Sequence, residues 1–307
     1  MKYIIEGIAT IRSANLYYFL IALAVYLLSV LLYALRLKII LKNIYIKISI
    51  LDAITAQFLT ITVNNLTPSA KTGGELARAA YVYAKTKASL ANIITAIVFE
   101  RLSEAFPITA LALIAFYATL ISHRVSIYVI AAVMLPVLGI ILGIKYWDKF
   151  MEYLLRKSEE RGLTLINEEE ELTSLKEMMR NYKLLLLAIG LSSCVWALDV
   201  LRLYIIGLSV GWHAPLFKFM LLSVFYLIIG LFAITPGGLG IVGGGLTAAL
   251  VALGAPANKA IAITIIERLI SYGIATLIGG VVATLTGGWQ AWKLLRLRWR
   301  RTGSTPK

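Results

Sequence analysis

The chain has 307 residues, of which 60% are hydrophobic and only 15% are charged. Soluble domains have about 25% charged residues, so this composition, with a mean hydropathy of +0.83, excludes a water-soluble globule and a disordered chain. One cysteine and two histidines exclude a disulfide scaffold and leave no cysteine-based zinc site. We predict an all-α, polytopic transmembrane helical bundle.

The 30 basic and 16 acidic residues give a net charge of +14 and are spread unevenly. Nine of the acids lie between residues 148 and 182, and all of the others except Glu6 lie in or beside apolar segments. In a membrane protein, a basic excess indicates cytoplasmic loops and contact with anionic lipids. We therefore expect anionic or phosphate-headed membrane lipids, and no nucleic acid, as partners. A homo-oligomer and a lipid-modifying enzyme as partner both stay open.

The first half of the chain contains three candidate spans and one short apolar segment. The first span covers residues 15–35. Residues 49–66 are apolar but short, and they run into the sequence NNLTPSAKTGG. Residues 88–121 exceed the roughly 20 residues that a straight span needs, so we expect Pro107 to divide or kink them. Residues 125–147 form the next span.

The second half begins after an acidic segment, residues 148–182, which is too charged to enter a bilayer and which we predict to be a cytoplasmic helical connector. Apolar segments resume at residues 183–207 and 216–234, and the sequence TPGGLGIVGGG follows. Residues 257–285 form the last long apolar segment. The basic tail at 289–307 contains three tryptophans and no acid, which predicts an interfacial, cytoplasmic C-terminus.

The two halves share three landmarks in the same order at nearly the same spacing, which indicates an internal repeat. An LRL triplet returns after 166 residues, a Thr-Pro pair after 168 and a Glu-Arg-Leu triplet after 167. We assign residues 15–121 to the first repeat and residues 183–285 to the second. The landmarks are Arg36 and Arg202, Thr67-Pro68 and Thr235-Pro236, and Glu100-Arg101 and Glu267-Arg268.

The distribution of basic residues predicts the orientation of the repeats. If the short segments beside each Thr-Pro pair enter the membrane and return on the same side, the first half has three full spans, and the second copy is inverted. The basic loops at 36–47 and 71–87 then lie in the cytoplasm, and residues 203–217 and 237–256, which contain no lysine or arginine, lie outside. We therefore predict two inverted repeats with two re-entrant hairpins, an architecture characteristic of transporters.

The candidate substrate-binding residues belong to two groups. The first group consists of threonine, proline and glycine residues that interrupt apolar segments. Irregular backbone in a bilayer must lie within protein or beside a wet cavity. In such a cavity, glycine amides can approach an anion. Tight packing through small residues is the alternative. Ionisable residues form the second group, because each charge in an apolar segment costs about 2.5–3.5 kcal/mol. The candidates are Arg36, Thr67, Pro68, Gly73, Gly74, Glu75, Arg78, Glu100, Arg101, Arg202, Thr235, Pro236, Gly237, Gly238, Glu267 and Arg268.

Neighbouring residues on a helix point about 100° apart, so Glu100 and Arg101 do not face each other. We expect the repeat to bring Arg101 toward Glu267 and Arg268 toward Glu100. A purely structural ion network that locks the two halves together is the alternative interpretation.

Asp199 and Arg202 are spaced i, i+3 and are expected to pair. Arg36 lacks an acid at that spacing, so we expect it to meet lipid head groups. Neither histidine nor Cys194 has neighbours that suggest catalysis. We expect no catalytic residue, no metal and no cofactor.

The sequence TPSAKTGGELARAAYV with its ERL triplet, and TPGGLGIVGGG with the second ERL, resemble the lysylphosphatidylglycerol synthase transmembrane region, a flippase-like domain, over about residues 15–290. In two-domain synthases this region is joined to a soluble aminoacyl-transferase domain, and it is credited with moving the modified lipid across the bilayer. The resemblance therefore implies a multi-pass flippase or transporter for a phosphate-headed lipid in the cytoplasmic membrane, without synthase activity. Two alternatives stay open: an intramembrane enzyme that modifies a glycolipid or polyprenyl phosphate, and a non-catalytic scaffold subunit.

Overall fold

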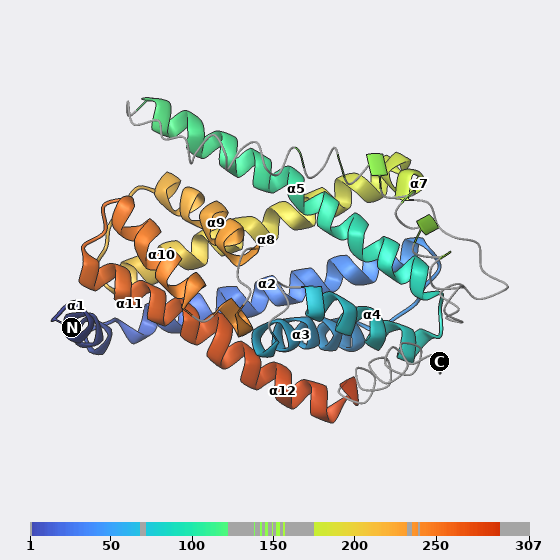
Figure 1. Ribbon diagram of the computed structural model, residues 1–307, viewed down its shortest axis with the longest axis horizontal. Coiled ribbons are helices and arrows are strands. Elements are labelled where there is room, and N and C mark those ends of the chain that lie inside the picture. Colours follow the sequence, from blue (N-terminus) through green and yellow to red (C-terminus); the bar gives the residue numbers. More distant parts are fainter. Residues whose placement is uncertain are drawn as a thin grey trace, which may run out of the picture.

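The computed structural model describes residues 2–67, 72–121, 175–231, 235–238 and 240–288, with scattered residues between 138 and 156. Within these ranges all regular structure is helical (Figure 1), which confirms the all-α prediction. Most of the predicted span at 125–147, most of the connector at 148–182 and the tail at 289–307 lie outside the described residues.

Three helical stretches in the described part are long and apolar enough to cross a membrane: Leu16–Asn43, Tyr182–Ser209 and Ala257–Leu285. The other helices lie before and between them. The elements in chain order are α1 (Lys2–Arg12), α2 (Leu16–Asn43), α3 (Ile50–Leu66), α4 (Thr72–Thr86), α5 (Leu90–Ile121), α7 (Leu175–Arg180), α8 (Tyr182–Ser209), α9 (Leu216–Leu231), the 3-10 turn η1 (Pro236–Gly238), α10 (Ile241–Ala252), α11 (Ala257–Arg268), the π-helical turn η2 (Leu269–Ile274) and α12 (Ala275–Leu285).

Helices α2 and α8 carry the two LRL triplets and pack side by side along the molecule (Figure 1). At one end of the pair, the backbone N–H of Asn15 donates to the carbonyl of Ser209 at 3.1 Å. At the other end, Asn181 Nδ2 donates to Asn43 Oδ1 at 3.4 Å. Since the start of each helix lies beside the end of the other, α2 and α8 are antiparallel over their whole length.

Helices α3 and α4 form one hairpin, and α9 and α10 form another. In the first hairpin, the side-chain oxygen of Asn64 accepts a hydrogen bond from the backbone N–H of Gly74 at 2.8 Å. A Cβ atom at Gly74 would collide with the carbonyl oxygen of Thr60 and with the Asn64 side chain. Glycine therefore allows α3 and α4 to approach closely beside the Thr-Pro segment.

Asp52 joins the two helices at the other end of this hairpin. Its carboxylate accepts hydrogen bonds from the hydroxyls of Ser49 (2.6 Å) and Tyr81 (2.9 Å) and lies 3.5 Å from Lys85 Nζ. Partial burial by itself raises the pKa of Asp52, but these hydrogen bonds and the lysine charge outweigh it and lower the pKa. The ionised carboxylate thus stabilises the contact between α3 and α4.

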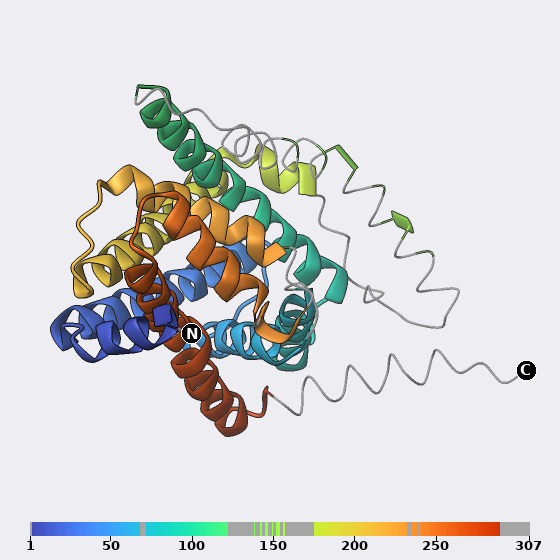
Figure 2. The same ribbon diagram turned by 60° about the vertical axis from the view of Figure 1, so that its left-hand side comes forward.

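Each hairpin packs against the long helix of the opposite repeat: α3 against α12, and α9 against α5. Asn65, near the end of α3, donates to the carbonyl of Ser271 (3.2 Å) and to the hydroxyl of Thr276 (2.8 Å). Gly237 in η1 has a φ of +57°, and a Cβ there would lie 2.9 Å from the backbone oxygen of Asn65. The two interrupted segments therefore meet, and η1 lies beside α3 (Figure 2).

Three features differ from the sequence expectation or add to it. Helix α5 is one continuous 32-residue helix that contains Pro107, so the proline does not divide it. The last long segment is interrupted instead by η2, directly after Glu267 and Arg268; widened turns of this kind often occur at functional sites. The N-terminal residues form α1, which packs against α11.

Candidate functional site

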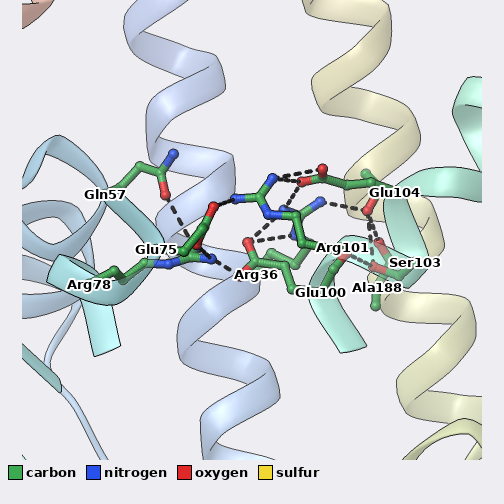
Figure 3. A network of polar contacts seen from close by, with 10 residues as sticks. Arg36, Gln57, Glu75, Arg78, Glu100, Arg101, Ser103, Glu104 and Ala188 are labelled. Atoms are coloured by element: carbon green, nitrogen blue, oxygen red, sulfur yellow. Dashed lines mark hydrogen bonds and ion pairs between the residues drawn. The ribbon is translucent and has the colours of Figure 1, made fainter. Parts of the chain in front are cut away.

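Three arginines and three glutamates from α2, α4 and α5 form one polar network, here called the first network (Figure 3). Their formal charges sum to zero. Since an unpaired charge is costly in an apolar interior, mutual pairing is what lets six ionised groups lie together between these helices. The members are Arg36, Glu75, Arg78, Glu100, Arg101 and Glu104.

Glu100 lies at the centre of the first network and is fully buried. Arg36 Nη2 lies 2.5 Å from its Oε1 atom, and Arg78 Nη1 lies 2.9 Å from its Oε2 atom. Arg36 also pairs with Glu104 and donates to the hydroxyl of Ser192 on α8 at 2.6 Å. The expectation that Arg36 meets lipid head groups was therefore wrong: its side chain is 0% exposed and connects α2, α5 and α8.

One edge of the first network reaches the surface. The carboxylate of Glu75 bridges Arg78 Nη2 (2.5 Å) and Arg101 Nη2 (2.6 Å). Arg101 Nη1 also lies 2.8 Å from Glu104 Oε2. The side chain of Arg101 is 37% exposed and that of Glu75 is 24% exposed, whereas Arg36, Arg78 and Glu100 are fully buried. An anion from outside the protein would meet the first network at Arg101.

The second network occupies the corresponding place in the second repeat, between α8, α9 and α11. Arg202 Nη1 lies 3.0 Å from Glu267 Oε1, and Arg202 Nη2 lies 2.8 Å from Asp199 Oδ1. The hydroxyl of Tyr226 also donates to Glu267 Oε1, at 3.0 Å. The predicted local pair of Asp199 and Arg202 is thus confirmed. With Arg268, the formal charge of this network is also zero.

Arg268 is half-buried and turns toward the glycine-rich segment. Its Nη2 atom donates to the carbonyl oxygen of Gly237 at 2.5 Å, and its guanidinium lies 5.1 Å from the ring centre of Tyr272. In the described part of the chain, no carboxylate lies within 4.0 Å of this guanidinium. Its Nη1 atom also donates to the hydroxyl of Tyr226 at 3.4 Å. The positive charge of Arg268 is therefore held by a backbone carbonyl, a tyrosine hydroxyl and an aromatic ring.

The predicted pairs of Arg101 with Glu267, and of Arg268 with Glu100, were wrong. Each glutamate pairs with the LRL arginine of its own half, and each following arginine turns toward a hairpin. The separation of about 100° between adjacent helical residues explains this arrangement. When the glutamate faces α2 or α8, the next residue faces the interrupted segment.

The two networks are linked by reciprocal contacts between α2 and α8. Ser192, which binds Arg36, lies ten residues before Arg202 on α8. Tyr26, whose ring centre lies 5.4 Å from the guanidinium carbon of Arg202, lies ten residues before Arg36 on α2. At a rise of 1.5 Å per residue, the networks lie about 15 Å apart along the α2–α8 pair.

The remaining predicted residues lie in the interrupted segments. Thr67 ends α3 and donates its hydroxyl to a carbonyl of that helix at 2.6 Å, and Gly73 lies in the first turn of α4. Pro68 lies outside the described residues. Residues Pro236–Gly238 form η1, which is closed by a hydrogen bond from the Gly238 N–H to the carbonyl of Thr235 at 2.8 Å.

Sequence analysis did not place several polar partners in the site. Glu104 shares a helix face with Glu100 at the i, i+4 spacing, so its participation was readable from the sequence. Ser192 matches Tyr26 at the spacing of the LRL triplets, but Tyr26 does not stand out in the sequence either. Gln57, which accepts from Arg78 at 3.5 Å, and Tyr226 give no such signal.

These features define an all-helical membrane protein in which buried charges are paired between neighbouring helices. The chain belongs to the family of the lysylphosphatidylglycerol synthase TM region, whose model matches residues 6–279. It is similar to a UPF0104 membrane protein of Pyrococcus horikoshii, with 28% identity over 299 residues that cover 90% of this chain and 89% of the relative.

Two other archaeal relatives match over similar lengths. A UPF0104 membrane protein of Methanothermobacter thermautotrophicus is 24% identical over 294 residues, which cover 88% of this chain and 85% of the relative. A UPF0104 membrane protein of Methanocaldococcus jannaschii is 23% identical over 288 residues, which cover 89% and 85%. The likeness therefore extends across both repeats.

Proposed function

We propose that this protein is a lipid flippase that moves an anionic or phosphate-headed lipid across the cytoplasmic membrane. The observation that carries the proposal is the position of Arg101 and Arg268. Each follows a fully buried glutamate, each is partly exposed, and each contacts a residue in or directly after an interrupted segment. Arginine binds phosphate through several fixed N–H donors, so these two side chains are suited to receive the head group.

We further propose that the two halves are inverted repeats. Helices α2 and α8 contain matching triplets but run antiparallel, as an inverted pair must. Their contacts are reciprocal, since position 192 meets Arg36 and the matching position 26 meets Arg202. Each hairpin also packs against the long helix of the opposite repeat. These relations are what a pseudo-two-fold axis in the membrane plane would produce.

The hairpins α3–α4 and α9–α10 are proposed to be re-entrant. Their helices contain 17, 15, 16 and 12 residues, equivalent to about 18–26 Å, whereas the hydrocarbon core is about 30 Å thick. Two such hairpins meeting at Asn65 and Gly237 would bring irregular backbone together inside the protein, where it can be tolerated. A head group crossing the membrane would pass this meeting point.

A transporter is favoured over an intramembrane enzyme because the carboxylates are already engaged. Glu75, Glu100, Glu104 and Glu267 each contact at least one arginine. An intramembrane enzyme that uses a carboxylate as acid or base would need that carboxylate free to meet its substrate. Assembly with itself or with a lipid-modifying enzyme stays a prediction.

The test is lipid translocation by the purified full-length protein in proteoliposomes. A fluorescent phosphatidic acid, placed in both leaflets, is quenched from outside with dithionite; an active flippase makes the inner pool accessible. We expect activity in the wild type and a loss of at least about tenfold in Arg101→Ala and in Arg268→Ala, since each removes a charge-assisted contact worth about 1.5–3 kcal/mol.

The matched control is Arg180→Ala, which removes an exposed arginine outside both networks and is expected to leave transport unchanged. Transport of the probe at equal rates by the wild type, Arg101→Ala and Arg268→Ala would refute the role of these arginines. A chemically altered probe, detected by mass spectrometry, would favour the enzyme alternative, and an inert wild type would favour the scaffold.

A further inference from the structure

We propose that the carboxylate of Glu75 is an internal stand-in for the phosphate group: it occupies the anion site between Arg78 and Arg101 and is displaced when a phosphate binds. The inference deepens the proposed function and rests on it for the identification of that phosphate as a lipid head group. The first network is then a gated site: when no ligand is bound, the side chain of Glu75 occupies the anion site and closes it.

The geometry around Glu75 is that of a bound anion. Its two oxygens bridge two guanidinium groups, with Oε2 at 2.5 Å from Arg78 and Oε1 at 2.6 Å from Arg101. Phosphate is bound by arginines in the same way. Glu75 also lies in the first turn of α4, where the helix dipole favours negative charge.

The remaining contacts allow Glu75 to leave without exposing an unpaired charge in the interior. Arg78 keeps Glu100 at 2.9 Å, and Arg101 keeps Glu104 at 2.8 Å. The network then holds three arginines and two glutamates, a formal charge of +1, at its exposed edge. A phosphate with one negative charge restores neutrality.

Unused hydrogen-bond donors point to a ligand with more oxygens than a carboxylate. Among the described residues, the buried Nε–H groups of Arg78 and Arg101 have no acceptor within hydrogen-bonding distance. A buried donor without an acceptor is unfavourable, and a carboxylate offers only two oxygens. A phosphate group offers at least three, so it can engage donors that Glu75 leaves unpaired.

The second repeat shows the matching arginine without such a stand-in. The position 168 residues after Glu75, the spacing of the Thr-Pro pairs, is Gly243 in the first turn of α10. The matching arginine, Arg268, contacts a backbone carbonyl where Arg101 contacts Glu75. The second repeat therefore folds without an acid at this position. This indicates that Glu75 has a role in the anion site and is not needed for the fold of a repeat.

The test compares phosphate binding by the detergent-solubilised full-length wild type and Glu75→Gln, with inorganic phosphate and dihexanoyl phosphatidic acid as probes in separate titrations. Glutamine keeps the size of the side chain but removes the charge, so we expect Glu75→Gln to bind about tenfold more tightly. Adding Arg101→Ala to Glu75→Gln should abolish this gain. Glu177→Gln, an exposed glutamate outside the networks, is the control and should bind like the wild type.

Equal or weaker binding by a folded Glu75→Gln variant would overturn the proposal. A measurement on the wild type keeps the proposal testable if that variant does not fold: saturating phosphate should change hydrogen exchange in peptides covering residues 72–79 and 98–105. Unchanged exchange in both peptides would also overturn it. A gain with phosphatidic acid identifies a lipid head group, and a gain with inorganic phosphate alone identifies a free anion.

The outcomes separate this inference from the proposed function. Tighter binding by Glu75→Gln in a protein whose wild type moves no lipid would keep the anion site and remove the flippase. Lipid transport by a wild type in which Glu75→Gln binds no more tightly would keep the flippase and remove the stand-in.

Discussion

Replacing Arg202 with methionine removes the ionic partner of a fully buried glutamate. Glu267 Oε1 lies 3.0 Å from Arg202, and the hydroxyl of Tyr226 would remain as a donor to it. Loss of one member of a buried ion pair costs about 3–5 kcal/mol, whereas replacing both members with apolar groups of similar size is often neutral. We expect Arg202→Met to lower the free energy of unfolding by about 3–5 kcal/mol, and Arg202→Met/Glu267→Met to recover part of that loss, since Asp199 still lacks its arginine.

The assay is reversible unfolding of the full chain in mixed detergent micelles, followed by circular dichroism, with the free energies analysed as a double-mutant cycle. The cycle of Arg202 and Glu267 should give a coupling energy of at least about 2 kcal/mol. The cycle of Arg101 and Glu267 is the control; it should be additive within about 0.5 kcal/mol, because these two residues share no partner. Additivity in the first cycle, or strong coupling in the second, would refute this account of the networks.

Two further predictions concern the α3–α4 hairpin. Gly74→Ala should destabilise the protein by about 1–3 kcal/mol, because the new Cβ meets the carbonyl of Thr60; Gly244→Ala, which meets nothing within 4 Å, is the control, and equal melting temperatures would contradict the close approach. Since the pKa of Asp52 is lowered in the folded protein, its contribution to stability is complete above about pH 4 and is lost as the pH falls below that value. The excess of the wild-type melting temperature over that of Asp52→Asn should therefore be larger at pH 7 than at pH 3, and a constant difference would contradict the linkage.

The sequence identified most charged members of both networks because a charge inside an apolar segment is conspicuous. Glu100 and Glu267 stand out for this reason, and their shared spacing from the LRL triplets places them in matching positions. Composition likewise predicted the all-helical membrane class. These inferences rest on local sequence and on the repeat spacing, neither of which requires knowledge of how the helices pack.

The partners of those charges could not be predicted from the sequence alone. A difference of about 100° separates Glu100 from Arg101, so a modest rotation of α5 decides which of them faces α2. That rotation is set by packing against α2 and α8, which bring Arg36 and Ser192 to the same place. The prediction of cross-repeat pairs failed at this step.

Pro107 does not divide α5, for a physical reason. In a soluble helix, proline removes a hydrogen bond and clashes with the preceding turn, so it commonly marks a boundary. Transmembrane helices tolerate proline, because neighbouring helices and serine or threonine hydroxyls can satisfy the freed carbonyls. The carbonyl four residues before Pro107 belongs to Ser103, at a point where α5 lies against α8. Tertiary packing thus overrides the local rule.

The charges of the two networks are balanced by acids at different positions, and that difference bears on mechanism. At the position three residues before each LRL arginine, the first repeat has Tyr33 and the second has Asp199. Asp199, which helps to neutralise the second network, therefore lies on the long helix α8. Glu75, its counterpart in the first network, lies in the first turn of the short helix α4. A side chain in the first turn of a short helix can move with its hairpin, but one in the middle of α8 cannot. We therefore expect the gate in the first half of the chain, with Arg268 as the fixed arginine that receives an anion released from Arg101.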